Sequence, residues 1–169
     1  GILECPSLGE AVKFVQQIKH ASGQNYIIGG PRGIFDFEGS ANKVSRYEPS
    51  PGTARICHTN HPLANDDQSI FQEMLKGRPP ERQPRGTNNS EIRLISLEKR
   101  ISDPAKQVTI EVIKETLSSK DDPRNPVCVE RRLDGRGGFT AGCVIMELSE
   151  TPKLHVAPGP PCATDFQTF

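Results

Sequence analysis

The alternation of hydrophobic and polar positions predicts helices at the start and in the middle of the chain. The first is expected to begin at Ser7, because Ser7 and Glu10 have the spacing of a capping box. Its apolar stripe consists of Ala11, Val12, Val15 and Ile18. A second helix is predicted over residues 89–101, and a third over 103–117 with Asp103 as N-cap and Pro104 at the first helical position.

Short segments with period-two alternation predict strands in two other regions. The first four lie at residues 25–29, 34–40, 41–49 and 53–61, separated by turn residues. Three more are predicted at 127–133, 137–148 and 151–159. The order of helix, strands, helices and strands contains no βαβ alternation. It therefore favours an α+β fold in which helices pack against antiparallel sheet.

Composition narrows the functional classes further. The 169 residues suffice for one domain, and 21 basic residues balance 21 acidic ones, so no net field attracts nucleic acid or an anionic membrane. No apolar run is long enough for a membrane span. The five cysteines are scattered without a CxxC pair, which argues against a disulfide framework or a zinc knuckle and mildly favours the cytoplasm.

The segment ICHTNHPLANDD, residues 56–67, concentrates the candidate chemistry. A metal site at His58 and His61 is disfavoured, since residues three apart on a strand face opposite sides and no further ligands stand at a recognised spacing. A dyad of Cys57 and His58 fails because adjacent strand residues point apart. Asp66 and Asp67 are better suited to capping a helix over residues 68–75 than to acid–base work.

Asn60 and Arg93 each allow two interpretations. An amide at a strand end can donate to a developing oxyanion, but an asparagine can equally satisfy its own turn. Arg93 lies one helical turn from Ser90. It either pairs with a carboxylate for structural reasons or orients catalytic groups.

Five segments together resemble one known family, the isopenicillin-N acyltransferase-like proteins. These form the acyl-coenzyme A:6-aminopenicillanic acid acyltransferase group of the N-terminal-nucleophile hydrolases. The resemblance runs, in order, through SLGEAVKFVQQIKHASGQNYIIG, FDFEGSANKVSRY, ICHTNHPLANDD, NSEIRLISLEKRI and KLHVAPGPPC. Its most specific parts are ASGQNY, SANKV and HTNHP. Gly39 stands where relatives often have another small residue.

The resemblance implies an αββα sandwich of two antiparallel sheets between helical layers. It also implies a precursor that cleaves itself to expose an N-terminal cysteine, which attacks an amide or thioester carbonyl with its own α-amino group as proton acceptor. Asn60 would be the oxyanion donor and Arg93 would orient the nucleophile. The substrate-binding residues would be His58, Thr59, His61 and Ser90. No metal or cofactor is implied.

The nucleophilic cysteine of this family lies upstream of the SLGEAV helix, and nothing in the chain occupies that place. Residues 1–169 are therefore interpreted as the C-terminal portion of a single such domain, inactive alone. Its expected partners are the missing N-terminal segment and a small-molecule amide or acyl thioester, without nucleic acid or membrane and with possible homo-oligomers. The alternative is a non-catalytic binding domain that keeps the sandwich and lacks the nucleophile.

Overall fold

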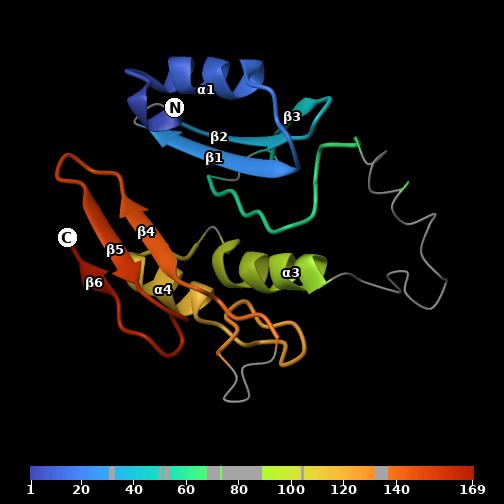
Figure 1. The fold of residues 1–169 in the computed structure, drawn as a ribbon. Coiled ribbons are helices and arrows are strands. Elements are labelled where there is room, and N and C mark those ends of the chain that lie inside the picture. The colour runs from blue at the N-terminus through green and yellow to red at the C-terminus, as the bar shows by residue number, and fades with distance from the viewer. Residues whose placement is uncertain are drawn as a thin grey trace. The chain divides into compact units, whose positions relative to one another are not determined.

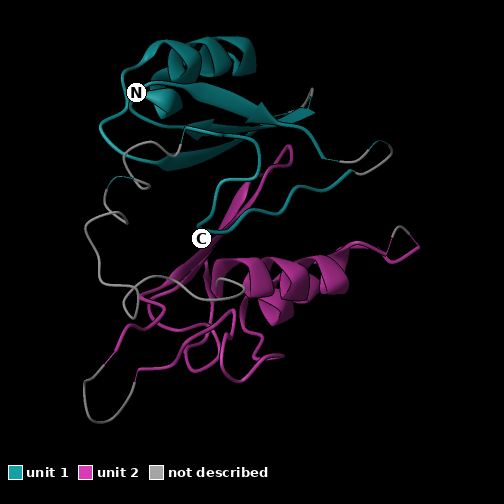
Figure 2. Cartoon of the chain, turned by 90° about the vertical axis from the view of Figure 1, so that its right-hand side faces the viewer, with its two compact units in different colours: residues 1–88 teal, residues 89–169 magenta. Residues whose placement is uncertain are grey.

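The computed structural model describes residues 1–30, 33–49, 51, 54–67, 73, 89–103, 105–131 and 137–169. The chain forms two compact units, Gly1–Asn88 and Asn89–Phe169, and each is described by itself (Figures 1 and 2). Both units contain helix and antiparallel sheet, which confirms the predicted α+β class. The αββα sandwich and the single domain over residues 1–169 stay predictions.

Unit 1 begins with the short 3-10 helix η1 (Ile2–Glu4) and helix α1 (Leu8–Gln17). Ser7 is the N-cap of α1, and its hydroxyl accepts a hydrogen bond from the Glu10 amide at 3.3 Å. This cap satisfies an amide that has no partner within the helix. The predicted start of the first helix is therefore confirmed.

The sheet of unit 1 has the order β1-β2-β3, with β1 at Gln24–Gly30, β2 at Gly33–Gly39 and β3 at Val44–Tyr47. Both pairings are antiparallel. Helix α1 lies along one face of this sheet (Figure 1). The buried core between them consists of Ala11, Val15, Ile28 and Phe37. Three of the four predicted strands of this region are thus present.

The fourth predicted strand, at residues 53–61, is wrong for the described part of that segment. Residues 54–61 pair with no strand. Instead the chain from His58 to Asn65 follows the face of the sheet opposite α1, where its polar groups bind a side chain of β2. The alternation of apolar and polar residues that suggested a strand belongs to a segment held through side-chain contacts of His58 and Thr59, without strand pairing.

Unit 2 contains α3 (Asn89–Ile101) and α4 (Ile110–Leu117). The predicted helix at 89–101 is confirmed. The start predicted at Asp103 is wrong, because the N-cap of α4 is Thr109, whose hydroxyl accepts from the Val112 amide at 3.3 Å. Asp103 instead accepts from the Ala105 amide at 3.0 Å, as in a local turn.

The sheet of unit 2 has the order β4-β5-β6, with β4 at Cys143–Glu147, β5 at Lys153–Ala157 and β6 at Gln167–Thr168. The strands predicted within 137–148 and 151–159 are confirmed as β4 and β5. The strand predicted at 127–133 is wrong for residues 127–131, which belong to no sheet. Val129 nevertheless exchanges two hydrogen bonds with Thr140.

Two expectations fall outside the described residues. The first is Pro104 as the first helical residue of the third predicted helix. The second is the helix suggested over residues 68–75, of which only Glu73 is described. Within the described part of the chain, no helix combines the length and the apolar character needed to span a membrane.

The structure gives a physical reason for Gly39, the last residue of β2. A Cβ atom built on Gly39 would lie 2.8 to 2.9 Å from three ring atoms of His20. His20 is buried, and its ring nitrogens lie 3.3 Å from the Val15 carbonyl oxygen and 3.3 Å from the Tyr26 hydroxyl. The ring therefore has little freedom to move, and only glycine fits beneath it.

We expect Gly39→Ala to lower the free energy of unfolding by about 1 to 3 kcal/mol, as overpacking of a buried site does. Urea denaturation monitored by circular dichroism measures this. Gly23→Ala is the matched control, because a Cβ at Gly23 meets no atom within 4 Å. The cost should disappear in a His20→Ala background. A cost that persists there would show that the His20 ring is not its cause.

Candidate functional site

A pocket of about 440 Å³ lies in unit 1 on the side of the sheet opposite α1. The start of β1, the turn between β2 and β3, and the segment 58–67 contribute its walls. Amide, hydroxyl and imidazole groups are frequent among the residues that line it: Gly23, Gln24, Asn25, Glu38, Gly39, Ser40, His58, Thr59, Asn60, His61, Pro62, Asn65 and Asp67.

Strand β2 places two carboxylates on the pocket side of the sheet. Phe37 belongs to the core beneath α1, and successive side chains of a strand point to opposite faces, so Asp36 and Glu38 point away from that core. Both are buried, Asp36 completely and Glu38 nearly so. A buried carboxylate is costly unless hydrogen bonds stabilise its charge.

Glu38 is stabilised by four hydrogen bonds from residues far along the chain. Its Oε1 accepts from the Leu63 amide at 2.5 Å and lies 2.6 Å from His58 Nε2. Its Oε2 accepts from the amides of Ala64 at 2.9 Å and Asn65 at 2.5 Å. We call these five residues the Glu38 cluster. It fixes both ends of the segment from His58 to Asn65 to the centre of the sheet.

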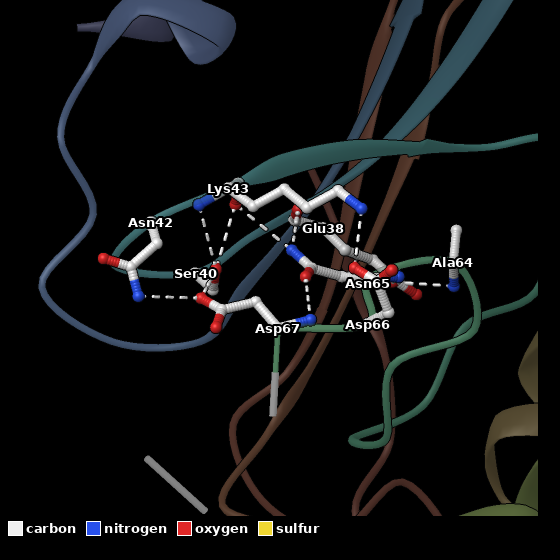
Figure 3. A network of polar contacts seen from close by, with 8 residues as sticks. All are labelled: Glu38, Ser40, Asn42, Lys43, Ala64, Asn65, Asp66 and Asp67. Carbon is white, nitrogen blue, oxygen red and sulfur yellow. Dashed lines mark hydrogen bonds and ion pairs between the residues drawn. The ribbon is translucent and has the colours of Figure 1, made fainter. Parts of the chain in front are cut away.

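A second set of contacts fixes the residues that follow (Figure 3). The side-chain amide of Asn65 donates to the Glu38 carbonyl oxygen at 2.9 Å and to the Lys43 carbonyl oxygen at 3.1 Å. Asp67 accepts from the Ser40 hydroxyl at 2.5 Å and from the Asn42 amide at 3.2 Å. The segment is thereby held to β2 and to the turn after it.

The other charged contact of this turn is an exposed ion pair between Lys43 Nζ and Asp66 Oδ1 at 2.6 Å. Asp66 and Asp67 were expected to cap a helix over residues 68–75. In the described residues, their carboxylates bind the turn between β2 and β3.

Both ring nitrogens of His58 face oxygen acceptors. Nε2 lies 2.6 Å from the Glu38 carboxylate, and Nδ1 lies 2.5 Å from the Thr59 carbonyl oxygen. A neutral imidazole has only one N–H and would turn a lone pair toward one of these oxygens. The contact between His58 and Glu38 is buried, with each side chain only 5% exposed, and it is an ion pair when His58 is protonated.

Asn60 is exposed at a bend formed by residues 60 and 61, and it lines the pocket. Its neighbours are ordered by polar contacts, because Thr59 Oγ1 lies 3.1 Å from His61 Nδ1 and His58 is bound to Glu38. A side-chain amide thus stands at the pocket on a backbone that is fixed on both sides. This is the arrangement that preorganised hydrogen-bond donation requires.

Hydrogen bonding separates the pKa values of the two neighbouring carboxyl groups. Burial by itself raises the pKa of Glu38, but the hydrogen bonds from His58, Leu63, Ala64 and Asn65 outweigh it, so this pKa lies below its ordinary value. Neither oxygen of Asp36 has a partner at hydrogen-bond geometry in the described parts of the chain. Burial raises the pKa of Asp36, and the lowering effects of His58 and the Asn25 amide do not outweigh it.

The predicted site residues fall into both units. His58, Thr59, Asn60 and His61 lie around the pocket of unit 1. Ser90 and Arg93 lie on α3 of unit 2, where Ser90 is buried and Arg93 Nε donates to Asn89 Oδ1 at 2.9 Å. Their catalytic and substrate-binding roles stay predictions. Across the described residues, no group of three or more histidine, cysteine or acidic side chains is arranged to hold a metal.

Sequence reasoning missed Glu38 and Asn65, which position the segment carrying Asn60. One signal was present in the sequence. Asp36 and Glu38 alternate with Phe35 and Phe37 in a strand that is followed by many turn-forming residues able to cover its second face.

We expect Glu38→Gln to lower the free energy of unfolding at neutral pH by about 2 to 4 kcal/mol, since it removes the charged acceptor that His58 contacts and weakens three buried amide contacts. The stabilisation by Glu38 is complete above the ordinary pKa of 4.5 and is lost as the pH falls through the lower folded value. The difference between the two proteins should therefore shrink in acid. Urea denaturation from pH 7 to pH 3 measures it.

Asp66→Asn is the matched control for Glu38→Gln. It also replaces an acid by its amide in this network, but the Asp66 side chain is 81% exposed and its ion pair with Lys43 is surface-screened. Its effect at pH 7 should be much smaller. Equal losses from the two substitutions would contradict the importance assigned to the Glu38 cluster.

Asp36→Asn should have the opposite pH dependence. Between the ordinary pKa of 3.8 and the raised folded value, the native state binds more protons than the unfolded state, so native stability falls as the pH rises. Asparagine does not titrate, so the stability of the variant does not fall with rising pH for this reason. We expect its stability relative to the native sequence to increase from pH 4 to pH 7 in the same urea experiment. A difference that is constant with pH would show that Asp36 has no raised pKa.

The chain matches a known protein family over most of its length. The family model described as acyl-coenzyme A:6-aminopenicillanic acid acyl-transferase matches residues 1–138, which include all of unit 1 and both helices of unit 2. No curated protein matches the chain. Because the family model matches well over half of the 169 residues, the chain belongs to the acyl-coenzyme A:6-aminopenicillanic acid acyl-transferase family, as its sequence motifs predicted.

Proposed function

We propose that this chain supplies the oxyanion-stabilising part of an enzyme that transfers an acyl group from an amide or an acyl thioester, or hydrolyses that bond. Membership of an acyltransferase family supports the reaction class. The observation that carries the proposal is the placement of Asn60, an exposed amide at a bend of the pocket whose flanking residues are fixed by Glu38.

The proposed step is attack of a cysteine thiolate on the substrate carbonyl carbon. A carbon–sulfur bond forms, and the electron pair of the carbonyl bond moves to the oxygen. The Asn60 side-chain N–H donates to this oxyanion, which carries more charge than the carbonyl it replaces. Collapse of the intermediate expels the amine or the thiolate, and water or an acceptor amine then takes the acyl group from sulfur.

The nucleophile in this proposal comes from outside residues 1–169. No cysteine belongs to the pocket lining in the described structure. Cys57, which directly precedes the lining residue His58, is half-buried. We assign the attack to a cysteine exposed at a new N-terminus by self-cleavage, with its own α-amino group accepting the thiol proton. The resemblance to the family implies this arrangement of nucleophile and base.

The remaining pocket residues fit a polar part of the substrate. Gln24 and Asn25 offer amide groups from β1, and Thr59 and His61 stand on either side of Asn60. Such donors and acceptors suit the amide or thioester group and its polar substituents. We propose Thr59 and His61 as substrate contacts.

We expect Asn60→Ala to lower turnover about 10²- to 10³-fold in the full-length enzyme, which corresponds to about 3 to 4 kcal/mol of transition-state stabilisation. Ground-state binding should change much less, because the hydrogen bond is needed mainly in the transition state. Release of thiol from acyl-coenzyme A thioesters and of chromophore from N-acyl anilides measures kcat and KM. The melting temperature should remain that of the native enzyme.

Asn65→Ala provides the matched control. It removes an amide of the same type from the same segment, but that amide is buried and binds two backbone carbonyl oxygens. It should lower the melting temperature and leave turnover per folded molecule closer to normal. If Asn60→Ala instead lowers the melting temperature and spares kcat, Asn60 only supports its turn and the proposal fails.

A further inference from the structure

Three of the five cysteines lie in unit 2, and two of them are held against the same end of helix α4. The amide of Cys128 donates to the Ser119 carbonyl oxygen at 3.0 Å. The hydroxyl of the preceding residue, Ser118, donates to the Pro161 carbonyl oxygen at 3.0 Å. Cys162 directly follows Pro161. Two adjacent residues after α4 thus bring the backbones of Cys128 and Cys162 together.

Side-chain contacts close the gap between these two segments. Lys120, the next residue after Ser119, forms an ion pair with Glu130, two residues beyond Cys128. Glu130 in turn interacts with the Cys162 thiol, and Cys162 interacts with Cys128. The two cysteines, both free thiols, therefore lie near each other where the residues after α4 hold their segments.

We propose that Cys128 and Cys162 form a redox modification site, in which a low-molecular-weight disulfide such as oxidised glutathione converts the two thiols into an intrachain disulfide. The bond would join the segment after α4 to the turn between β5 and β6. This inference does not depend on the proposed acyl-transfer function, because none of its residues lines the pocket of unit 1.

The chemistry balances without any further reagent. The Cys162 thiolate attacks one sulfur of oxidised glutathione, forms a mixed disulfide and releases one glutathione thiolate. Cys128 then loses its proton and attacks the Cys162 sulfur, which releases the second glutathione. The two protein thiols lose two electrons and two protons in total, and the oxidant gains both.

Exposure decides which cysteine reacts first. Cys162 is half-buried, whereas Cys128 is completely buried, so an oxidant in solution reaches Cys162. Burial, followed by the nearby Cys128, raises the pKa of Cys162 to about 11. The thiolate is the attacking species, so oxidation should accelerate about tenfold per pH unit between pH 7 and pH 9.

The third cysteine of unit 2 provides an internal comparison. Cys143 lies in β4, and burial, followed by the nearby Cys128 thiol, raises its pKa. Cys143 therefore shares the environment of Cys128, but the segments that the residues after α4 hold are those of Cys128 and Cys162. The pairing expected from the structure is between residues 128 and 162.

The test incubates the full chain with oxidised glutathione at pH 8, followed by thiol titration in denaturant and peptide mapping without reduction. We expect the number of free thiols to fall from the five of the sequence to three, with one linked peptide joining residues 128 and 162. Dithiothreitol should restore all five. The oxidised protein should melt at a higher temperature, because the cross-link restricts the unfolded chain.

Two substitutions separate this pair from the other cysteines. Cys162→Ser should abolish the linked peptide, whereas Cys143→Ser should leave both its yield and its pH dependence unchanged. The proposal is overturned if five thiols persist after oxidation, if the linked peptide joins Cys143 or a cysteine of unit 1, or if Cys143→Ser prevents the linkage. A rate that does not rise with pH would equally contradict attack by Cys162.

Discussion

The organisation of unit 1 depends on the buried carboxylate of Glu38. The segment from Leu63 to Asn65 belongs to no helix or sheet in the described structure, so its amides need acceptors elsewhere. Glu38 accepts from all three amides and from His58. A carboxylate without these donors would be costly to bury, and the amides without the carboxylate would each cost about 1 to 3 kcal/mol. The segment and the strand therefore stabilise each other.

Local sequence signals were sufficient to predict those helices and strands that depend mainly on their own residues. Ser7 marks the start of α1, and the period-two alternation marks β2 and β5. They failed where the stabilising partner is distant. The segment 54–61 has the alternation of a strand, but its contacts are made by side chains and not by a neighbouring strand. At α4 both Asp103 and Thr109 are good N-caps, and the helical apolar period begins only at Ile110.

The candidate site likewise contains residues that the sequence identified and residues that it did not. The sequence identified the residues from His58 to His61, and the family resemblance gave Asn60 its expected role. The alternation of Glu38 with apolar residues was a signal, but it did not by itself predict the part that Glu38 plays, because such alternation is also typical of a strand with one face in water. Only the covering segment, 20 residues and more further along the chain, turns that position into a buried one. For Arg93, the sequence left open a structural pairing with a carboxylate or a catalytic role, and in the structure its Nε donates to Asn89 Oδ1.

The two buried carboxyl groups of β2 also determine the charge beside the pocket. An uncompensated carboxylate close to Asn60 would oppose negative charge on a substrate oxygen, because charges in a buried environment are weakly screened. Glu38 has less of this effect, because the His58 imidazole and three backbone amides surround its carboxylate. Burial raises the pKa of Asp36, which reduces the negative charge that this group carries at a given pH. The strand thus supports the pocket with carboxyl groups whose charge is offset or reduced, which favours the proposed oxyanion chemistry.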